Sequence, residues 1–341
     1  MNNELREEEL NEAATIINKI SAYYDYRIVG QSNLKKALLV ALMTEGHILL
    51  ESVPGLAKTT AAKVLTDAFS AKFSKIQCTP DLLPSDIVGT QIFNYSTNKF
   101  ETIIGPVNAN FVLLDEINRS SAKTQSAMLE VMQEKKLTIA GVTYNVPDPF
   151  IVIATQNPIE QEGTYLLAEA QLDRFLLKEV INYPTIEEEI EILNRVESGV
   201  IIDNPKILDI SAIKYLQELT KKVYVDGTIK SYISRIIYAT RHPHEFIHED
   251  LANYIEIGAS PRGSIAIMNV SKALAILNGR NYVTPDDCKE MIHSILRHRI
   301  ELNYAAVADG ITTEQIIDAI VGAIDTPWKQ IYRKNKSKYI Y

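Results

Sequence analysis

The stretch that decides the fold reads Ser52-Val53-Pro54-Gly55-Leu56-Ala57-Lys58-Thr59-Thr60. It follows an apolar run, His47–Leu50, and leads into the helical run Ala61–Phe69. A buried strand, a tight loop, a Lys-Thr pair and a helix predict a phosphate-binding loop, because loop amides and a helix N-terminus attract anions. Lys58 is then expected to reach the outer phosphates, and the Thr59 hydroxyl is expected to bind magnesium.

Three more apolar runs lie nearby, at Phe73–Gln77, Phe111–Leu114 and Phe150–Ala154. Their apolar character is continuous rather than alternating, which is typical of parallel strands buried on both faces. Two hairpins interrupt this pattern, at Ile92–Ile104 and at Leu137–Asn145. We therefore predict an α/β fold in which helices sandwich a parallel β-sheet.

After Pro184 the pattern becomes helical. Thr185 and Glu188 form a capping box, and apolar residues then recur at helical spacing. Further helices are expected to start near Ser211, Gly227, Arg262, Thr284 and Thr313. The sequence thus predicts an α/β nucleotide-binding core over residues 1–184, followed by a smaller all-helical domain over residues 185–341.

Two of the apolar strands end in polar residues. Asp115 can hold magnesium through water, and Glu116 can polarise an attacking water. Asn157 follows the run Phe150–Ala154, at the sheet edge where open α/β folds bind ligands, so it can position the water or touch the γ-phosphate. Each has a plainer reading: solvated acids at a strand end, and a turn asparagine before Pro158.

Two arginines are candidate charge stabilisers. Arg174 lies past the third strand and could act on a neighbouring subunit's nucleotide, although a surface pair with Asp173 is the simpler reading. Arg262 follows Gly258-Ala259-Ser260-Pro261 near a helix start, where it is either a phosphate sensor or a solvated residue.

Composition narrows the functional classes. Thirty-five Lys and Arg against 43 Asp and Glu give a net charge of −8, which argues against nucleic-acid binding as the main function. Cys78 and Cys288 lie far apart, so we expect two buried free thiols rather than a zinc site or disulfide. No apolar run approaches the roughly 20 residues of a membrane span, and no leader pattern is present, so a cytoplasmic location is expected.

Taken together, these segments resemble the AAA+ ATPases, and among them the MoxR family. The resemblance runs from about Ile28 to Arg262 in family order. It rests on the segments Val53–Thr59, Thr79–Asp86, Gly105-Pro106, Leu114–Arg119, Ala154–Pro158, Glu169–Phe175 and Ala259–Arg262.

The resemblance implies a role for each matching residue. Lys58 and Thr59 would be the Walker A pair, Asp115 and Glu116 the Walker B pair, and Asn157 sensor 1. Arg174 would be the arginine finger and Arg262 sensor 2, acting in cis or in trans. The hairpins would be the helix-2 insert and the pre-sensor-1 hairpin, and the helical domain would be a lid. The nucleotide-binding residues would be Ile28, Val29, Gly30, Pro54, Gly55, Leu56, Ala57, Lys58, Thr59 and Thr60.

The resemblance also implies the activity. The chain would hydrolyse ATP with Mg²⁺ in a hexameric ring and drive chaperone-like remodelling or maturation of client proteins. A separate protein with a von Willebrand factor A domain would be a possible partner. Two alternatives stay open: a metal-chelatase-type motor subunit, and an ATP-binding scaffold with little hydrolysis. Departures from the family pattern at Ser52, Leu166 and Ala168 motivate the scaffold reading.

Overall fold

The computed structural model describes residues 5–53, 58–158, 164–199 and 207–327. The chain divides into two compact units, one formed by residues 15–217 and the other by residues 1–14 together with 218–341. Helices α1 (Glu7–Arg27) and α8 (Ser211–Lys222) each cross this division. The division into a core over residues 1–184 and a lid over residues 185–341 remains a prediction.

The first unit is built around a five-stranded sheet of order β2-β5-β8-β1-β9, and every pairing in it is parallel. Four of these strands are the predicted apolar runs, so the predicted fold class is confirmed. The edge strand β9 was not predicted. The strands are β1 (Ile48–Glu51), β2 (Phe73–Gln77), β5 (Phe111–Asp115), β8 (Ile151–Gln156) and β9 (Leu177–Val180).

The register of the sheet decides which residues meet at its carboxyl edge. Gln77 on β2 pairs with Asp115 on β5, and Glu51 on β1 pairs with Gln156 on β8. The apolar parts of β5 and β8 between them are buried on both faces, as continuous apolar strands should be. The sheet therefore presents a row of polar strand ends above a buried core.

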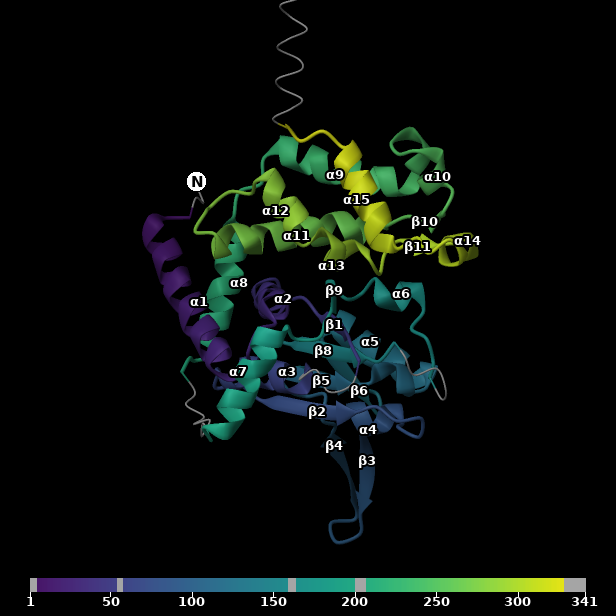
Figure 1. The fold of residues 1–341 in the computed structure, drawn as a ribbon. Helices are drawn as coiled ribbons and strands as arrows, with labels where there is room; N and C mark the ends of the chain where they lie inside the picture. Colours follow the sequence, from purple (N-terminus) through teal and green to yellow (C-terminus); the bar gives the residue numbers. More distant parts are fainter. Residues whose placement is uncertain (1–4, 54–57, 159–163, 200–206, 328–341) are drawn as a thin grey trace, which may run out of the picture. The chain divides into compact units, whose positions relative to one another are not determined.

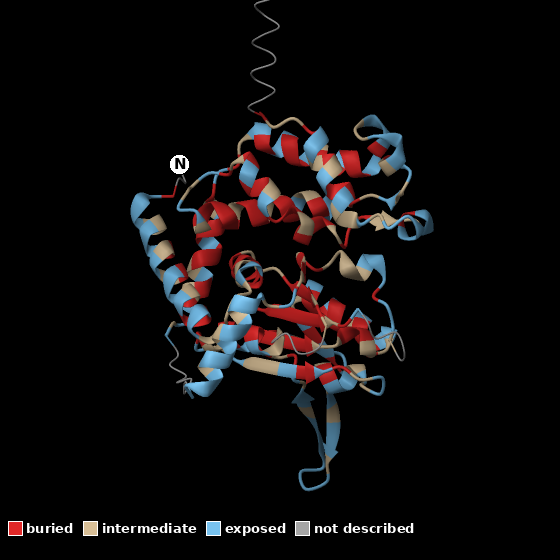
Figure 2. Cartoon of the chain, in the orientation of Figure 1, coloured by how far each residue is buried: buried red, intermediate tan, exposed pale blue. Residues whose placement is uncertain are grey.

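Helices flank this sheet and two hairpins leave it (Figure 1). Hairpin β3–β4 extends away from the sheet, and most of its residues are exposed (Figure 2). Both predicted hairpins are confirmed, at β3 (Gly89–Asn94) with β4 (Lys99–Ile104) and at β6 (Lys136–Ile139) with β7 (Val142–Asn145). The helices are α2 (Ser32–Met43), α3 (Lys58–Asp67), α4 (Pro84–Val88), η1 (Ile117–Arg119), α5 (Ala122–Glu134), α6 (Glu169–Leu172) and α7 (Ile186–Glu197).

The described residues of the second unit are mostly helical and contain one two-stranded sheet that the sequence did not predict, β10 (Ile255–Ile257) with β11 (Glu301–Leu302). The predicted helix starts hold: Thr284 caps α12 with Pro285 in its first turn. The helices are α9 (Gly227–Arg241), η2 (Pro243–Glu245), α10 (Glu249–Ala252), α11 (Pro261–Leu277), α12 (Pro285–Glu290), α13 (Ile292–Leu296), α14 (Tyr304–Ala308) and α15 (Thr313–Ala323). Cys78 and Cys288 are both buried and free, as expected.

Candidate active site

Asp115 ends β5 and lies among hydroxyl and ammonium groups. Its Oδ2 accepts a hydrogen bond from Thr59 Oγ1 at 3.4 Å and lies 2.8 Å from Lys75 Nζ. Its Oδ1 accepts a hydrogen bond from Thr155 Oγ1 at 2.7 Å. Burial raises the pKa of this carboxyl, but the bonds from Lys75 and Thr155 and the charge of Lys58 outweigh it, so the pKa lies below its ordinary value. Asp115 is therefore an ionised oxygen donor at the sheet edge.

Lys58 and Thr59 form the first turn of α3, which follows β1. Lys58 Nζ donates a hydrogen bond to the carbonyl of the buried Ser52 at 3.0 Å. The ammonium and the N-terminal turn of a ten-residue helix make this end of the site attractive to anions. The predicted loop residues Pro54, Gly55, Leu56 and Ala57 lie outside the described residues.

Glu116 has a left-handed backbone, with φ 59° and ψ 52°, which is uncommon for a residue other than glycine. Its N–H donates to Thr155 Oγ1 at 2.9 Å. Its carboxylate accepts a hydrogen bond from Gln77 Nε2 at 3.2 Å, and the same oxygen lies 3.3 Å from Arg119 Nε. These two contacts hold the Glu116 carboxylate beside Gln77 of β2 and Arg119 of η1.

Asn157 directly follows β8 and is buried. Its backbone carbonyl accepts a hydrogen bond from the Asn118 side chain at 3.4 Å. Since β8 and β5 are parallel neighbours, Asn157 and Glu116 follow adjacent strands at the same edge of the sheet. Lys58, Thr59, Asp115, Glu116 and Asn157 thus come together at one place, as the strand pattern predicts.

The sequence missed four residues of this cluster: Lys75, Gln77, Arg119 and Thr155. Thr155 links the two acids, because one hydroxyl donates to Asp115 and accepts from the Glu116 N–H. Gln77 and Lys75 reach the acids from β2, the strand next to β5. Finding Lys75, Gln77 and Thr155 requires the strand order, which a run of apolar residues does not reveal, whereas Arg119 contacts a glutamate only three residues before it in the sequence.

The residues at this edge fit a magnesium–nucleotide complex. Mg²⁺ prefers hard oxygen ligands, and the Thr59 hydroxyl and the Asp115 carboxylate already lie within 3.4 Å of each other. Lys58 supplies a cation at the beginning of α3, where a polyphosphate could be bound. The donor set therefore suits both groups.

A cavity of about 130 Å³ lies beside the segment Ile28–Gly30, which is predicted to bind nucleotide. Gly30 has φ 66°, which favours glycine, and a Cβ built on it would lie 2.1 Å from Glu188 Oε1, so a larger residue would also have to displace that side chain. Ile28 is buried, and Gln31 Nε2 donates to the Asn182 carbonyl at 3.0 Å. The cavity is lined by Gln31, Ser32, Asn33, Leu34, Glu179, Val180, Ile181, Asn182, Tyr183 and Glu188. Ile28, Val29 and Gly30 therefore lie next to this cavity in the chain without lining it.

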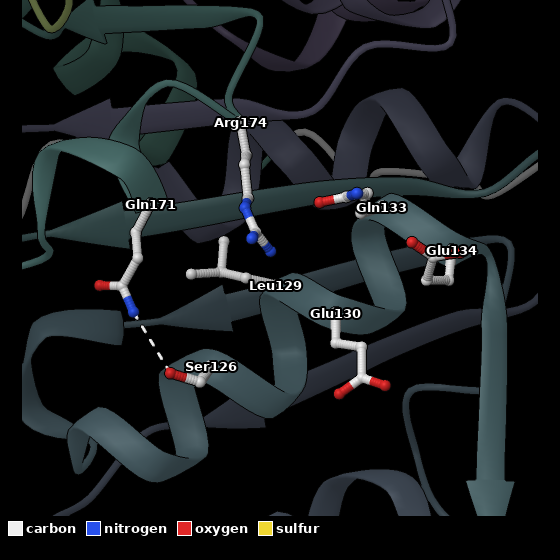
Figure 3. A pocket seen from close by; sticks show the side chains of 7 residues that line it. All are labelled: Ser126, Leu129, Glu130, Gln133, Glu134, Gln171 and Arg174. Atoms are coloured by element: carbon white, nitrogen blue, oxygen red, sulfur yellow. Dashed lines mark hydrogen bonds between the residues drawn. The ribbon is translucent and has the colours of Figure 1, made fainter.

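Arg174 does not join the cluster of acids. It extends from the residues after α6 toward α5 and lines a cavity of about 350 Å³ (Figure 3). Two carboxylates of α5, Glu130 and Glu134, line the same cavity. No described residue hydrogen-bonds its buried Nε. The side chain is thus held beside α5 without a fixed hydrogen bond at that nitrogen.

Arg262 lies in the second unit, in the first turn of α11. Its backbone N–H donates to the Ser260 side chain at 3.1 Å, so Ser260 is the N-cap of that helix. This position agrees with the predicted helix start, and the role of Arg262 stays a prediction.

Comparisons with known proteins agree with this geometry. Residues 47–177 match the family described as "ATPase family associated with various cellular activities (AAA)", and residues 248–320 match an AAA lid domain. Chaperone MoxR1 of Mycobacterium tuberculosis is 46% identical over 301 residues, which cover 88% of this chain and 79% of that protein. The chain belongs to the MoxR family of AAA+ ATPases.

Two further comparisons extend the likeness. The uncharacterized protein YeaC of Bacillus subtilis is 43% identical over 92% of this chain and 95% of its own length. The crystal structure of a putative ATPase from Cytophaga hutchinsonii has a TM-score of 0.87 and 45% identity, covering 94% of this chain and 97% of that one. Relatives named for magnesium-chelatase subunits are more distant, at 26% and 23% identity.

As a MoxR-family chain it has the expected parallel sheet, and the model for the lid domain matches within its second unit. Among the described residues, no helix is both long enough and apolar enough to cross a lipid bilayer.

Proposed function

We propose that this chain hydrolyses ATP to ADP and phosphate with the help of Mg²⁺. The observation that carries the proposal is the meeting of Lys58, Thr59, Asp115 and Glu116 at one edge of a parallel sheet. A cation for phosphate, two oxygen ligands for a metal and a carboxylate beside them are the parts that phosphoryl transfer to water requires.

Each residue then has one task. Lys58 and the first turn of α3 bind the outer phosphates, and Thr59 and Asp115 hold the metal, Asp115 through water. Bound Mg²⁺ supplies charge neutralisation on the phosphate oxygens. Glu116 orients the attacking water and polarises it, while Asn157 positions that water from the adjacent strand. No covalent intermediate with the protein is needed.

We further propose that the site is completed by a neighbouring copy of the chain. Arg174 lines a cavity beside α5 rather than the site of Asp115 and Glu116 in its own subunit, which suits a residue that acts on the next subunit's nucleotide. A ring of six copies, with Arg262 as a second phosphate sensor, follows from the family resemblance.

The client proteins on which the ATPase would act are inferred from relatives alone. Chaperone MoxR1 is named for a chaperone function, and we propose that this chain likewise remodels or matures client proteins. A protein with a von Willebrand factor A domain is the partner that the family resemblance suggests. The distance of the magnesium-chelatase relatives makes metal insertion the weaker alternative.

Steady-state ATP turnover of the purified chain tests the catalytic proposal. Replacing Glu116 by Gln should lower kcat at least ~100-fold, because the base that polarises water is lost, while ATP binding is retained. Glu187→Gln is the matched control, since it makes the same chemical change on an exposed glutamate of α7.

Three outcomes distinguish the proposed ATPase from an ATP-binding scaffold. Turnover that Glu116→Gln abolishes and Glu187→Gln leaves intact supports the proposed function. Turnover that survives Glu116→Gln contradicts the role of Glu116. A wild-type chain that binds ATP but does not hydrolyse it, alone or in the presence of Mg²⁺, favours the scaffold reading.

A further inference from the structure

Lys75 is paired with the carboxylate that the proposed function assigns to the metal. Its Nζ lies 2.8 Å from Asp115 Oδ2, the oxygen that also accepts from Thr59 Oγ1. Lys75 is on β2, and its strand neighbour Gln77 pairs with Asp115 in the sheet register. The ammonium is therefore placed by the sheet itself, on the same oxygen that faces the predicted metal ligand Thr59.

A lysine in this place competes with a metal ion. An ammonium group has three donors and no acceptor, so it can satisfy the carboxylate but cannot become a ligand of a cation. A water molecule between a carboxylate and a metal also donates to the carboxylate at about 2.8 Å, the length of this contact. The ammonium and a metal-bound water cannot both occupy that position, and the ammonium repels a dication.

The Lys75 side chain can move away from Asp115 when Mg²⁺ binds. It is 42% exposed, compared with 15% for the Asp115 side chain, and it sits on a flexible four-carbon stem. An ion pair with one exposed partner is worth little free energy, so Mg²⁺ together with nucleotide phosphates can displace it.

We propose that Lys75 is a built-in counter-cation for Asp115 that keeps the metal affinity of the nucleotide-free subunit low. Metal is then retained only when phosphate oxygens add ligands to those of Thr59 and Asp115. This inference rests on the proposed function of the site and adds a positioning residue to it.

The test measures metal binding by the nucleotide-free, full-length chain, with Mn²⁺ as the probe and electron paramagnetic resonance of free Mn²⁺ as the readout. Lys75→Met keeps the length of the stem and removes the charge, so it should bind Mn²⁺ roughly three- to tenfold more tightly than wild type. Lys75→Arg keeps the charge and should bind like wild type. Asp115→Asn should abolish the gain when combined with Lys75→Met.

The matched control is Lys72→Met, which removes an exposed lysine just before β2, at the end of the strand remote from Asp115. It should not change Mn²⁺ affinity. Lys75→Gln repeats the comparison if Lys75→Met does not fold, as judged by circular dichroism.

Equal or weaker Mn²⁺ binding by both Lys75→Met and Lys75→Gln overturns the inference, and so does a gain that Asp115→Asn leaves in place. Failure of the proposed function looks different. A wild-type chain that binds no ATP contradicts that function. Normal turnover together with unchanged Mn²⁺ affinity in the Lys75 variants contradicts only the proposed role of Lys75.

Discussion

At the scale of single residues, His47 shows how burial fixes a protonation state. It is buried at the start of β1, where its Nδ1 accepts from the Val152 N–H at 3.0 Å and its Nε2 lies 3.2 Å from the Met132 carbonyl. Those partners suit a neutral ring with its proton on Nε2. Burial lowers its pKa to about 4, and the Met132 bond offsets this only in part.

This histidine should make the fold sensitive to mild acid. The unfolded chain protonates His47 near pH 6.5 and the folded chain only near pH 4, so stability is fully present above pH 6.5 and falls between these values. The loss amounts to roughly 3 kcal/mol of unfolding free energy. Urea unfolding at several pH values should show a shallower dependence for His47→Asn than for wild type.

The control replaces an exposed histidine of η2, His244, by Gln, and this should leave the wild-type pH dependence unchanged. An equally steep dependence in His47→Asn and wild type would assign the acid sensitivity to other groups.

The same scale shows what sequence can and cannot predict about the site. Asp115, Glu116 and Asn157 follow apolar strands, so their places at the sheet edge follow from local pattern alone. Lys75 and Thr155 contact Asp115 only because β2 and β8 flank β5, which is a long-range property. Nothing in the neighbourhood of Lys75 in the sequence points to its partner 40 residues away.

At the scale of elements, four of the five strands were predicted, including the edge strand β2 although most of its residues are not buried, and the other edge strand, β9, was not predicted. β5 is a run of buried apolar residues, whereas β9 alternates buried and half-buried residues and contains Lys178 and Glu179. Charged residues occupy two of the four positions of β9, so its pattern resembles that of a loop.

The β3–β4 hairpin should contribute little to the stability of the fold. Phe93 contacts both Tyr95 and Phe100 there, with ring centroids 5.2 Å apart in each pair. Phe100 is 67% exposed, so Phe100→Ala should lower the unfolding free energy by less than about 1 kcal/mol. Phe111→Ala, which truncates a residue 1% exposed on β5, should cost about 3–5 kcal/mol.

Denaturant unfolding of the two variants gives the comparison directly, with the same residue type truncated at both sites. A loss for Phe100→Ala that approaches that for Phe111→Ala would mean that the hairpin is packed against something in solution.

At the scale of the whole molecule, the proposed shared site predicts complementation between two inactive chains. Arg174→Ala lacks the residue that acts on the neighbouring subunit's nucleotide, and Glu116→Gln lacks the residue that acts on the subunit's own nucleotide. When both are co-expressed and pair at random in a ring with head-to-tail interfaces, about a quarter of the sites have both residues intact. ATP turnover of the mixture should therefore recover to about that fraction of wild type.

Each variant purified alone, at the same total concentration, provides the baseline. A mixture no more active than these baselines would show that Arg174 does not act across subunits, and substantial activity of Arg174→Ala alone would show that it is dispensable.

The left-handed backbone of Glu116 has a practical consequence for protein engineering. Glycine adopts this conformation with less strain than glutamate does, by a margin on the order of 1 kcal/mol. A library sorted only for heat resistance would thus reward Gly at position 116 and fill with chains that have lost the proposed base. Sorting such libraries for ATP turnover as well as for heat resistance would keep this position intact.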